Sequence, residues 1–217
     1  NKKNTVSWDK YDVLRNMLLL QKHRGPDDSG IASVNTTSML VTQTDIENKI
    51  KFSEDDDLLF GFNRLSILDL SKNGHQPMLS PDGKVMLVFN GEVYNAFDYK
   101  DVLTQKGYKF VSRTDTEIIM YLYIEYGIEG MLQRLNGMFA IAIYDFERKK
   151  LFLTRDRFGI KPLYLLKTSD FITFSSEIKS FKALPDYKLK LNKNKLDEFL
   201  IFRYVINDTL FQDVINC

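Results

Sequence analysis

Apolar residues recur at helical spacing in two parts of the chain. In residues 11–21 this stripe stops shortly before a Gly-Pro pair, which cannot continue a helix. Residues 115–126 carry a second stripe, with Thr114 and Glu117 spaced as a capping box at its start and Gly127 just beyond its end. The pattern therefore predicts two amphipathic helices.

Short apolar runs joined by turns lie between and after these helices. Several are continuous rather than alternating, which is typical of strands buried on both faces. The connections 146–150 and 167–170 are too short for a helical crossover, so they favour antiparallel pairing. The sequence predicts an α+β fold with outer helices, a last helix over 192–204, and strands over 58–62, 85–89, 138–144, 151–154, 163–166 and 171–174.

Composition and charge narrow the class of protein. The 217 residues, of which 44% are hydrophobic, suffice for a sizeable core. Thirty basic residues against 29 acidic ones give a net charge of +1, without the basic excess that a nucleic-acid partner needs. No apolar run approaches the roughly 20 residues that span a bilayer, and the first residues lack the apolar middle of a secretory signal. We expect neither a nucleic-acid nor a membrane partner.

Cysteine and histidine usage bears on redox compartment and metals. A single Cys excludes an intrachain disulfide and suits a reducing compartment, so a cytoplasmic location is expected. The two His and the one Cys are far apart in sequence, without zinc-ligand spacing, and no GxxxxGK[ST] phosphate loop is present. The sequence therefore predicts no metal and no nucleotide cofactor in this chain.

The segment NGEVYN, residues 90–95, offers a candidate for chemistry. It follows an apolar strand, and the Asn90 amide beside the Gly91 N–H gives two donors for a developing oxyanion. An Asn-Gly pair between apolar runs is also a strong hairpin signal, and the segment alone favours that turn. The rest of the chain decides between the two interpretations.

Seven further motifs accompany NGEVYN in a fixed order. They are HRGPDDSG (23–30), NRLSILDL (63–70), QPM (76–78), RTDTE (113–117), GMFAIAIYD (137–145), RDRFGIKPLY (155–164) and SSEIKSF (175–181). From about His23 to Phe211 the chain resembles the glutaminase domain of glutamine-dependent asparagine synthetases, class II amidotransferases with an N-terminal Cys nucleophile. The resemblance implies the four-layer αββα sandwich of N-terminal-nucleophile hydrolases.

The residues around the Asn-Gly pair place the resemblance within the class. In the glucosamine-forming and phosphoribosyl amidotransferases a His commonly precedes this pair. Here Phe89 precedes it and Glu-Val-Tyr-Asn follows. These residues favour the asparagine synthetase branch, including asparagine synthetase-like proteins.

The resemblance also implies a role for each of five residues. Arg64 would pair with the α-carboxylate of glutamine, Asp115 with help from Glu92 would hold its α-amine, and Asn90 with Gly91 would form the oxyanion hole. Two plainer interpretations remain open. Arg64 could be a surface strand residue in an ion pair, and Asp115 could be a first-turn charge that the helix dipole favours.

Other motif residues are expected to be structural. Residues 24–27 and 155–164 carry Gly and Pro at positions that suit turns, so both motifs are predicted to be scaffold. His23 and His75 are also expected to be structural, because the implied mechanism uses no imidazole base. Compared with the family, residues 36–57 look partly inserted, and we expect part of them to form a surface insertion.

The nucleophile that the resemblance implies is absent from this sequence. It would be a terminal Cys whose own α-amine serves as base, followed by a short apolar strand, whereas this sequence starts at Asn1. Cys217 has no free α-amine and is not expected to replace it. The chain alone is therefore expected to be inactive: either the Cys lies upstream, or the domain is a natural homologue without glutaminase activity.

The resemblance completes a hypothesis for the function. Residues 1–184 would form the glutaminase domain and 185–217 a linker towards an absent synthetase domain, where ATP and Mg are expected. Glutamine would yield glutamate and ammonia, and the ammonia would reach an activated aspartate in that domain, with a homodimer also considered. Alternatives are a different ammonia acceptor, or a silent module that binds glutamine or shapes a partner.

Overall fold

The computed structural model describes residues 8–185, 187–206 and 208–217. The helices are α1 (Lys10–Leu20), α2 (Lys100–Gln105), α3 (Asp115–Arg134) and α4 (Leu196–Phe202). The strands are β1 (Asp28–Asn35), β2 (Leu40–Asp45), β3 (Leu58–Arg64), β4 (Met78–Leu79), β5 (Val85–Val93), β6 (Gly137–Asp145), β7 (Lys150–Arg155), β8 (Tyr164–Lys167), β9 (Ile172–Ser175) and β10 (Val214–Asn216). Short 3₁₀ turns include η2 (Lys72–Gly74).

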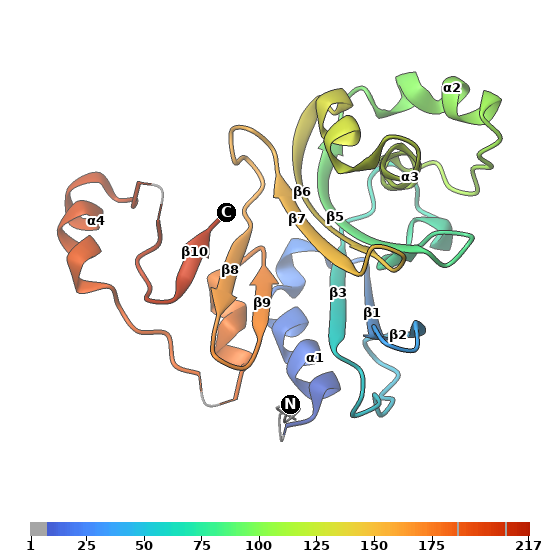
Figure 1. Cartoon of the computed structure of the whole chain (residues 1–217). Helices are drawn as coiled ribbons and strands as arrows, with labels where there is room; N and C mark the ends of the chain where they lie inside the picture. The colour runs from blue at the N-terminus through green and yellow to red at the C-terminus, as the bar shows by residue number, and fades with distance from the viewer. Residues whose placement is uncertain (1–7, 186, 207) are drawn as a thin grey trace.

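Two layers of antiparallel sheet lie between two layers of helix (Figure 1). One layer is the sheet β4-β5-β6-β7, whose outer face α2 and α3 cover. The other layer holds two smaller sheets, β2-β1-β3 and β10-β8-β9, and α1 packs on it. The predicted α+β fold with four αββα layers is confirmed.

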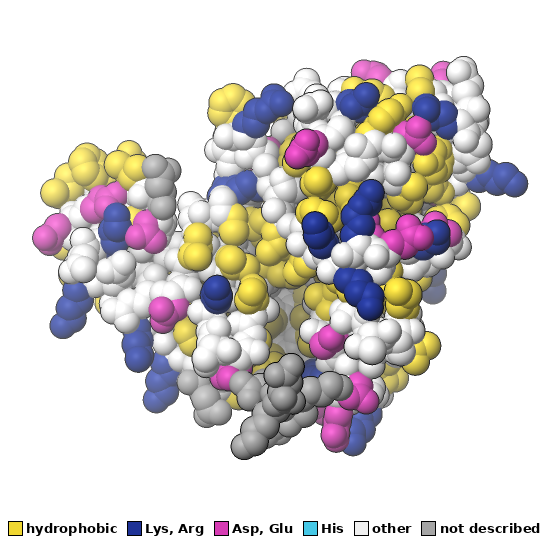
Figure 2. Space-filling view, viewed as in Figure 1, with side chains coloured by type: hydrophobic (Ala, Val, Ile, Leu, Met, Phe, Trp, Pro, Cys, Tyr) yellow, Lys and Arg dark blue, Asp and Glu magenta, His cyan; other side chains and the backbone are white. Residues whose placement is uncertain are grey.

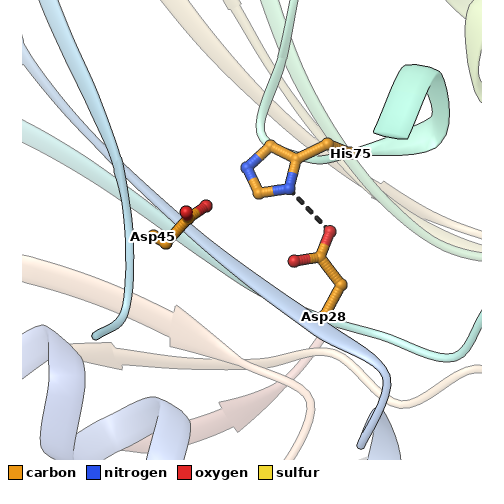
Figure 3. A group of neighbouring side chains, drawn as sticks. All are labelled: Asp28, Asp45 and His75. Carbon is orange, nitrogen blue, oxygen red and sulfur yellow. Dashed lines mark hydrogen bonds and ion pairs between the residues drawn. The ribbon is translucent and has the colours of Figure 1, made fainter. Parts of the chain in front are cut away.

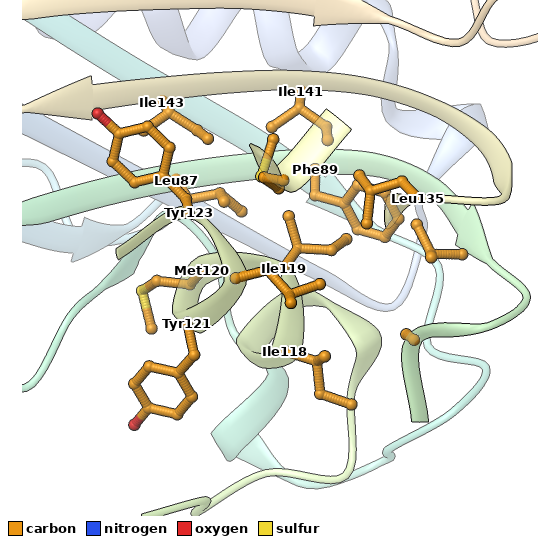
Figure 4. Packing of buried hydrophobic residues seen from close by; sticks show 14 of the residues in the cluster. Leu87, Phe89, Ile118, Ile119, Met120, Tyr121, Tyr123, Leu135, Ile141 and Ile143 are labelled. Carbon is orange, nitrogen blue, oxygen red and sulfur yellow. The ribbon is translucent and has the colours of Figure 1, made fainter. Parts of the chain in front are cut away.

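The central strands β5 and β6 are buried on both faces, as their continuous apolar runs predicted. On one face Leu87, Phe89 and Ile141 pack against α3, as Figure 4 shows. On the other face Met86 and Val88 belong to the cluster that joins this sheet to β1 and β3. Alternation along a strand sends successive side chains to opposite faces, so one apolar run supplies both cores.

The predicted helices are present, with different ends. In α1 the Asp9 carboxylate caps the first turn by accepting from the Tyr11 and Asp12 N–H groups. Helix α3 continues beyond the predicted stop: Gly127 takes a φ of 68° and breaks the regular geometry, and the helix then resumes to Arg134. Glycine alone therefore did not end the helix, because the apolar face beyond it still packs on the sheet.

Only half of the predicted capping box forms at the start of α3. The Thr114 hydroxyl accepts from the Glu117 N–H, as expected. The buried Glu117 carboxylate does not return to Thr114; it accepts from the N–H groups of Val111 and Ser112. It therefore anchors the loop that leads into the helix.

The six predicted strands are found, and four others were missed. β1 was missed because DSGIASVN is rich in small polar residues, and β4 because it has two residues. β2 lies within 36–57, so part of the expected insertion is an exposed edge strand paired with β1. β10 lies within the predicted linker 185–217 and pairs with β8. The predicted last helix shrinks to a 3₁₀ turn, Lys193–Lys195, followed by α4.

No helix in the described part of the chain is long and apolar enough to cross a membrane.

Candidate functional site

The Asn-Gly pair lies inside β5, and the hairpin interpretation is wrong. Asn90 pairs with Ala140 and Gly91 with Phe139 in a ladder that runs to Val93. A side chain at Gly91 would reach within 2.8 Å of Phe139 Cα and would collide with the Met138 carbonyl. Glycine is therefore required here by the close approach of β6 rather than by a turn.

Ladder geometry sets the direction of the Gly91 N–H. Hydrogen-bonded and non-hydrogen-bonded pairs alternate in an antiparallel ladder, and the Tyr94 N–H donates to Asn136 at 2.8 Å. N–H groups that point towards β6 recur at every second residue, and Tyr94 is one of them. Gly91 is an odd number of residues away from Tyr94, so its N–H points away from β6. The Gly91 N–H therefore lies on the other edge of β5. The neighbouring strand on that edge, β4, pairs with Met86 and Leu87 and does not reach Gly91.

The two N–H groups that flank Gly91 on this edge are held by side chains. The Phe89 N–H donates to Gln76 Oε1 at 2.7 Å, and the Val93 N–H donates to Asp115 Oδ2 at 3.0 Å. Both side chains are buried. The Gly91 N–H therefore lies between two fixed neighbours, in an orientation that a substrate oxygen could use.

The Asn90 side chain lies on the face of β5 that meets the second sheet layer. It shares this face with Val88, and its Nδ2 donates to Ser176 Oγ at 3.3 Å. Ser176 follows directly after β9. The Asn90 amide and the Gly91 N–H are adjacent donors, and an oxyanion hole needs two such donors.

Asp115 is almost fully buried, with 4% of its surface exposed. Burial raises the pKa of its carboxyl group, and the nearby charge of Glu92 raises the pKa further. A cationic partner would therefore stabilise the ionised form of this buried carboxylate. The first-turn interpretation and the ligand interpretation are compatible, because Asp115 is also the first residue of α3.

Arg64 is buried rather than a surface residue, with 7% of its surface exposed, so the surface interpretation is wrong. Its Nη1 donates to the Ser71 carbonyl at 2.9 Å and its Nη2 donates to the Asp69 carbonyl. These two contacts orient the guanidinium without neutralising its charge. The group remains suited to an anionic partner.

Arg64 and the start of α3 lie side by side against Gly74. A side chain at Gly74 would collide with the Arg64 guanidinium and would reach Thr114 Cγ2 at 3.0 Å. Thr114 precedes Asp115, whose carboxylate holds Val93 and lies near Glu92. The structure therefore brings Arg64, Asp115 and Glu92 to one end of β5, beside the Asn-Gly pair.

The residues expected to be scaffold make contacts that agree with that role. His23 Nε2 lies 2.9 Å from Glu177 Oε1, and Arg24 Nη1 lies 3.3 Å from the same oxygen. The Asp27 carboxylate accepts from the Ser66 N–H at 2.7 Å, which connects the HRGPD and RLS motifs. His75 Nδ1 lies 2.6 Å from Asp28 Oδ2.

Asp156 organises the 155–164 motif, a role that sequence reasoning missed. Its buried carboxylate accepts from the backbone N–H groups of Phe139, Phe158, Ile160 and Lys161. Burial opposes its ionisation, but these donors outweigh burial and hold the pKa of Asp156 below its usual value. The role of Gln76 in holding the Phe89 N–H was missed as well. Both Asp156 and Gln76 belong to motifs that the sequence analysis named.

We expect Asp156→Asn to lower the free energy of unfolding by about 1.5–3 kcal/mol at neutral pH, because hydrogen bonds to a charged acceptor are lost. The folded pKa lies below the unfolded one, so this stabilisation is present above the unfolded pKa and is lost as the pH falls through the folded pKa. Urea unfolding at neutral and acidic pH is the measurement. The exposed Asp98→Asn is the control. If the free energies of unfolding of the parent and of Asp156→Asn differ as much at low pH as at neutral pH, the assignment is contradicted.

Cys217 lies away from these groups in the chain, just after β10. Its N–H donates to the Leu163 carbonyl at 3.0 Å, and Arg155 donates to its carbonyl oxygen. Burial raises the pKa of the Cys217 thiol, which disfavours the nucleophilic thiolate. These contacts agree with the expectation that Cys217 is not the nucleophile.

The sequence and the fold match one class of protein. The family model described as "Glutamine amidotransferase domain" matches residues 43–216, and the chain belongs to this family. The glutamine phosphoribosylpyrophosphate amidotransferase of Bacillus subtilis, solved with ADP and GMP, shares the fold. Its TM-score is 0.67 at 21% identity, over 81% of this chain and 41% of that one.

Within the family, the chain is similar to asparagine synthetases. It is 38% identical over 182 residues to glutamine-hydrolyzing asparagine synthetase 2 of Bacillus subtilis, covering 84% of this chain and 21% of that protein. It is 33% identical over 197 residues to asparagine synthetase 1 of the same organism, covering 91% of this chain and 27% of that protein. The chain is thus homologous to the glutaminase domains of these enzymes, and it spans less than a third of the length of these relatives.

Proposed function

We propose that this chain is the glutaminase domain of an asparagine synthetase-like enzyme and that it serves to hydrolyse glutamine to glutamate and ammonia. The observation that carries the proposal is the edge of β5. There the Gly91 N–H, held between the anchored Phe89 and Val93, stands next to the Asn90 amide. Two donors from neighbouring residues, one a backbone N–H and one a side-chain amide, suit the oxyanion of a tetrahedral intermediate.

The neighbouring charges match the amino acid end of glutamine. Arg64 would donate two hydrogen bonds to the α-carboxylate in a bidentate pair, and Asp115 with Glu92 would hold the α-ammonium group. The raised pKa of Asp115 supports this role, because an ammonium group would relieve the cost of the buried carboxylate. The guanidinium of Arg64 donates to two carbonyls, and within the described residues no carboxylate forms a direct ion pair with it, so its charge remains for the substrate.

A cavity of about 900 Å³ supports the place proposed for the nucleophile. It is lined by β3 and β9, the edge strands of the two small sheets, and by residues of α1, β5 and β6. Asn90 and Ser176 line it. Figure 2 shows hydrophobic side chains over β8 and β9 and on the neighbouring rim of the central sheet. An apolar strand from upstream of Asn1 would pair with these two edges, on which no further strand of the described residues lies, and bring a Cys towards Asn90.

The proposed reaction runs through a thioester. The Cys thiol would attack the side-chain carbonyl of glutamine, and the α-amine of the same Cys would take up the thiol proton. The oxyanion would accept hydrogen bonds from the Asn90 amide and the Gly91 N–H. Collapse of the intermediate would release ammonia, and water would then hydrolyse the thioester to glutamate.

The ammonia acceptor is proposed from the relatives. An activated aspartate in a synthetase domain, which would use ATP and Mg, is the acceptor that the asparagine synthetases suggest. Exposed apolar residues of α4, Leu200, Ile201 and Phe202, support a further domain that covers this helix. A different acceptor, or a silent module, would be distinguished by experiment.

The test measures glutamate and ammonia released from glutamine by the full-length protein, with and without aspartate and ATP. We expect glutaminase activity in both conditions and asparagine only in the second. Hydrolysis without asparagine would indicate another acceptor. Glutamine binding without hydrolysis, with a mature terminus other than Cys, would overturn the enzymatic proposal and favour the silent module.

A further inference from the structure

Three side chains that the proposed glutaminase does not use converge on one side of the small sheet β2-β1-β3. Asp28 begins β1, Asp45 ends β2, and His75 follows η2. One ligand atom from each lies within 4.8 Å of the others. Figure 3 shows the three side chains pointing towards a common space, with the carboxylate of Asp45 across from the ring of His75.

The contact between His75 and Asp28 leaves a metal-binding nitrogen available. Nδ1 of His75 lies 2.6 Å from Asp28 Oδ2. An ionised carboxylate can only accept a hydrogen bond, so Nδ1 carries the proton, and in a neutral imidazole Nε2 keeps its lone pair. In Figure 3 Nε2 lies on the side of the ring that faces Asp45. A carboxylate behind a histidine is the usual support of a metal-binding imidazole.

The backbone positions this ring. Gly30 pairs with Asp45 in the β1–β2 ladder, and the ring of His75 lies directly against Gly30. A side chain at position 30 would reach Nε2 at 2.5 Å and Cε1 at 2.8 Å. Glycine therefore lets the imidazole approach the strand pair on which the two carboxylates lie.

In the part of the chain that the structure describes, no Lys or Arg ion pair balances the charge of the cluster. Among the described residues, no Lys or Arg forms an ion pair with the carboxylate of Asp28 or Asp45, and His75 is the partner of Asp28. Two carboxylates at this separation repel each other unless a cation lies between them. A divalent ion would supply that charge.

We propose that Asp45 and His75, with Asp28 supporting the His75 ring, bind one divalent transition-metal ion of the zinc type. An imidazole nitrogen with carboxylate oxygens suits Zn²⁺ better than Ca²⁺ or Mg²⁺, which take oxygen ligands. Zinc bonds of about 2.1 Å place tetrahedral ligands roughly 3.4 Å apart, so side-chain rotation would close the present spacing. Asp45 and Nε2 of His75 would be the protein ligands, while Asp28 would orient the ring through its contact with Nδ1.

The ion would connect the start of β1 and the end of β2 to residues 69–75. This segment contains the Asp69 and Ser71 carbonyls to which Arg64 donates. His75 follows Gly74, which packs against the Arg64 guanidinium, and the Asp69 and Ser71 carbonyls that hold Arg64 lie just before it. Zinc would therefore stabilise this segment against unfolding. The site is independent of the proposed glutaminase chemistry.

Calorimetric titration of the 217-residue chain with Zn²⁺, without a polyhistidine tag, tests the site. We expect one ion per chain, and an affinity lower by at least about tenfold in His75→Asn and in Asp45→Asn. The chain has two His, so His23→Asn is the matched control for the first variant, and Glu47→Gln in the turn after β2 is the control for the second. Both controls should bind as the parent does.

Two further measurements keep the test independent of folding. Circular dichroism without metal establishes whether each variant is folded, and Co²⁺ absorption in the visible reports ligation directly. Zn²⁺ should raise the unfolding temperature of the parent and of both controls, but not of His75→Asn. Stoichiometric Zn²⁺ binding that survives His75→Asn and Asp45→Asn, or no binding by the parent, would overturn the proposal.

Discussion

Replacing Asn90 by Ala in the full-length protein should lower the glutaminase kcat by roughly 10²–10³, the usual loss for one oxyanion donor, with little change in KM. The reason is geometric. Asn90 lies on the face of β5 that meets the cavity, beside the Gly91 N–H on the free edge. Its amide would act on the oxyanion and not on the amino acid end of glutamine.

The matched control for this prediction is Asn95→Ala in the same motif. Asn95 uses its side chain for structure: Nδ2 donates to the Arg134 carbonyl at 2.9 Å, and Oδ1 accepts from the Asn136 N–H. Its replacement should lower stability and both activities together. In Asn90→Ala, synthesis from free ammonia should survive. If ammonia-dependent synthesis falls with the glutaminase activity, Asn90 is a folding residue.

Arg64→Lys and Asp115→Asn should each weaken glutamine binding by about 2–5 kcal/mol, the cost of losing one partner of a buried charge pair. Lys cannot reproduce the planar fork that the Asp69 and Ser71 carbonyls orient. Asn removes the charge that would face the substrate ammonium group. Calorimetry with glutamine is the measurement, and the exposed Arg113→Lys and Asp98→Asn are the controls.

The stability of the ligand-free variants separates binding from folding. The pKa of Asp115 is raised in the fold, so its contribution to stability falls as the pH rises from the unfolded pKa towards the folded one. Asp115→Asn should therefore leave the ligand-free protein at least as stable as the parent at neutral pH, while glutamine binding is lost. A variant that is less stable and still binds glutamine would contradict the role of Asp115.

Sequence pattern predicted the elements better than their ends and partners. Six strands were predicted, because their apolar runs must be buried whatever they pack against. β1 and β10 were missed, since their burial comes from neighbours far away in sequence. Gly127 was expected to end a helix, but packing of α3 on the central sheet carries the helix past it.

Of the candidate site, the sequence could supply residue types and a resemblance but not the geometry. Asn90 and Gly91 were named as donors, yet the direction of the Gly91 N–H depends on its register with β6. Gln76 stood in a noted motif without a role, because its contact with Phe89 joins segments that no local pattern relates. The grouping of Asp28, Asp45 and His75 was equally invisible, since three distant segments supply it.

By itself, the sequence determined the class of fold and the order of the apolar strands and helices, because hydrophobic spacing and turn residues act over a few positions. Only the tertiary structure decided that the Asn-Gly pair continues a strand, that Arg64 is buried among carbonyls, and that Asp115 holds the edge of β5. Hydrogen-bond direction and burial arise from pairing between distant segments. Local sequence patterns do not determine hydrogen-bond direction or burial, so these features are known only from the packed sheets.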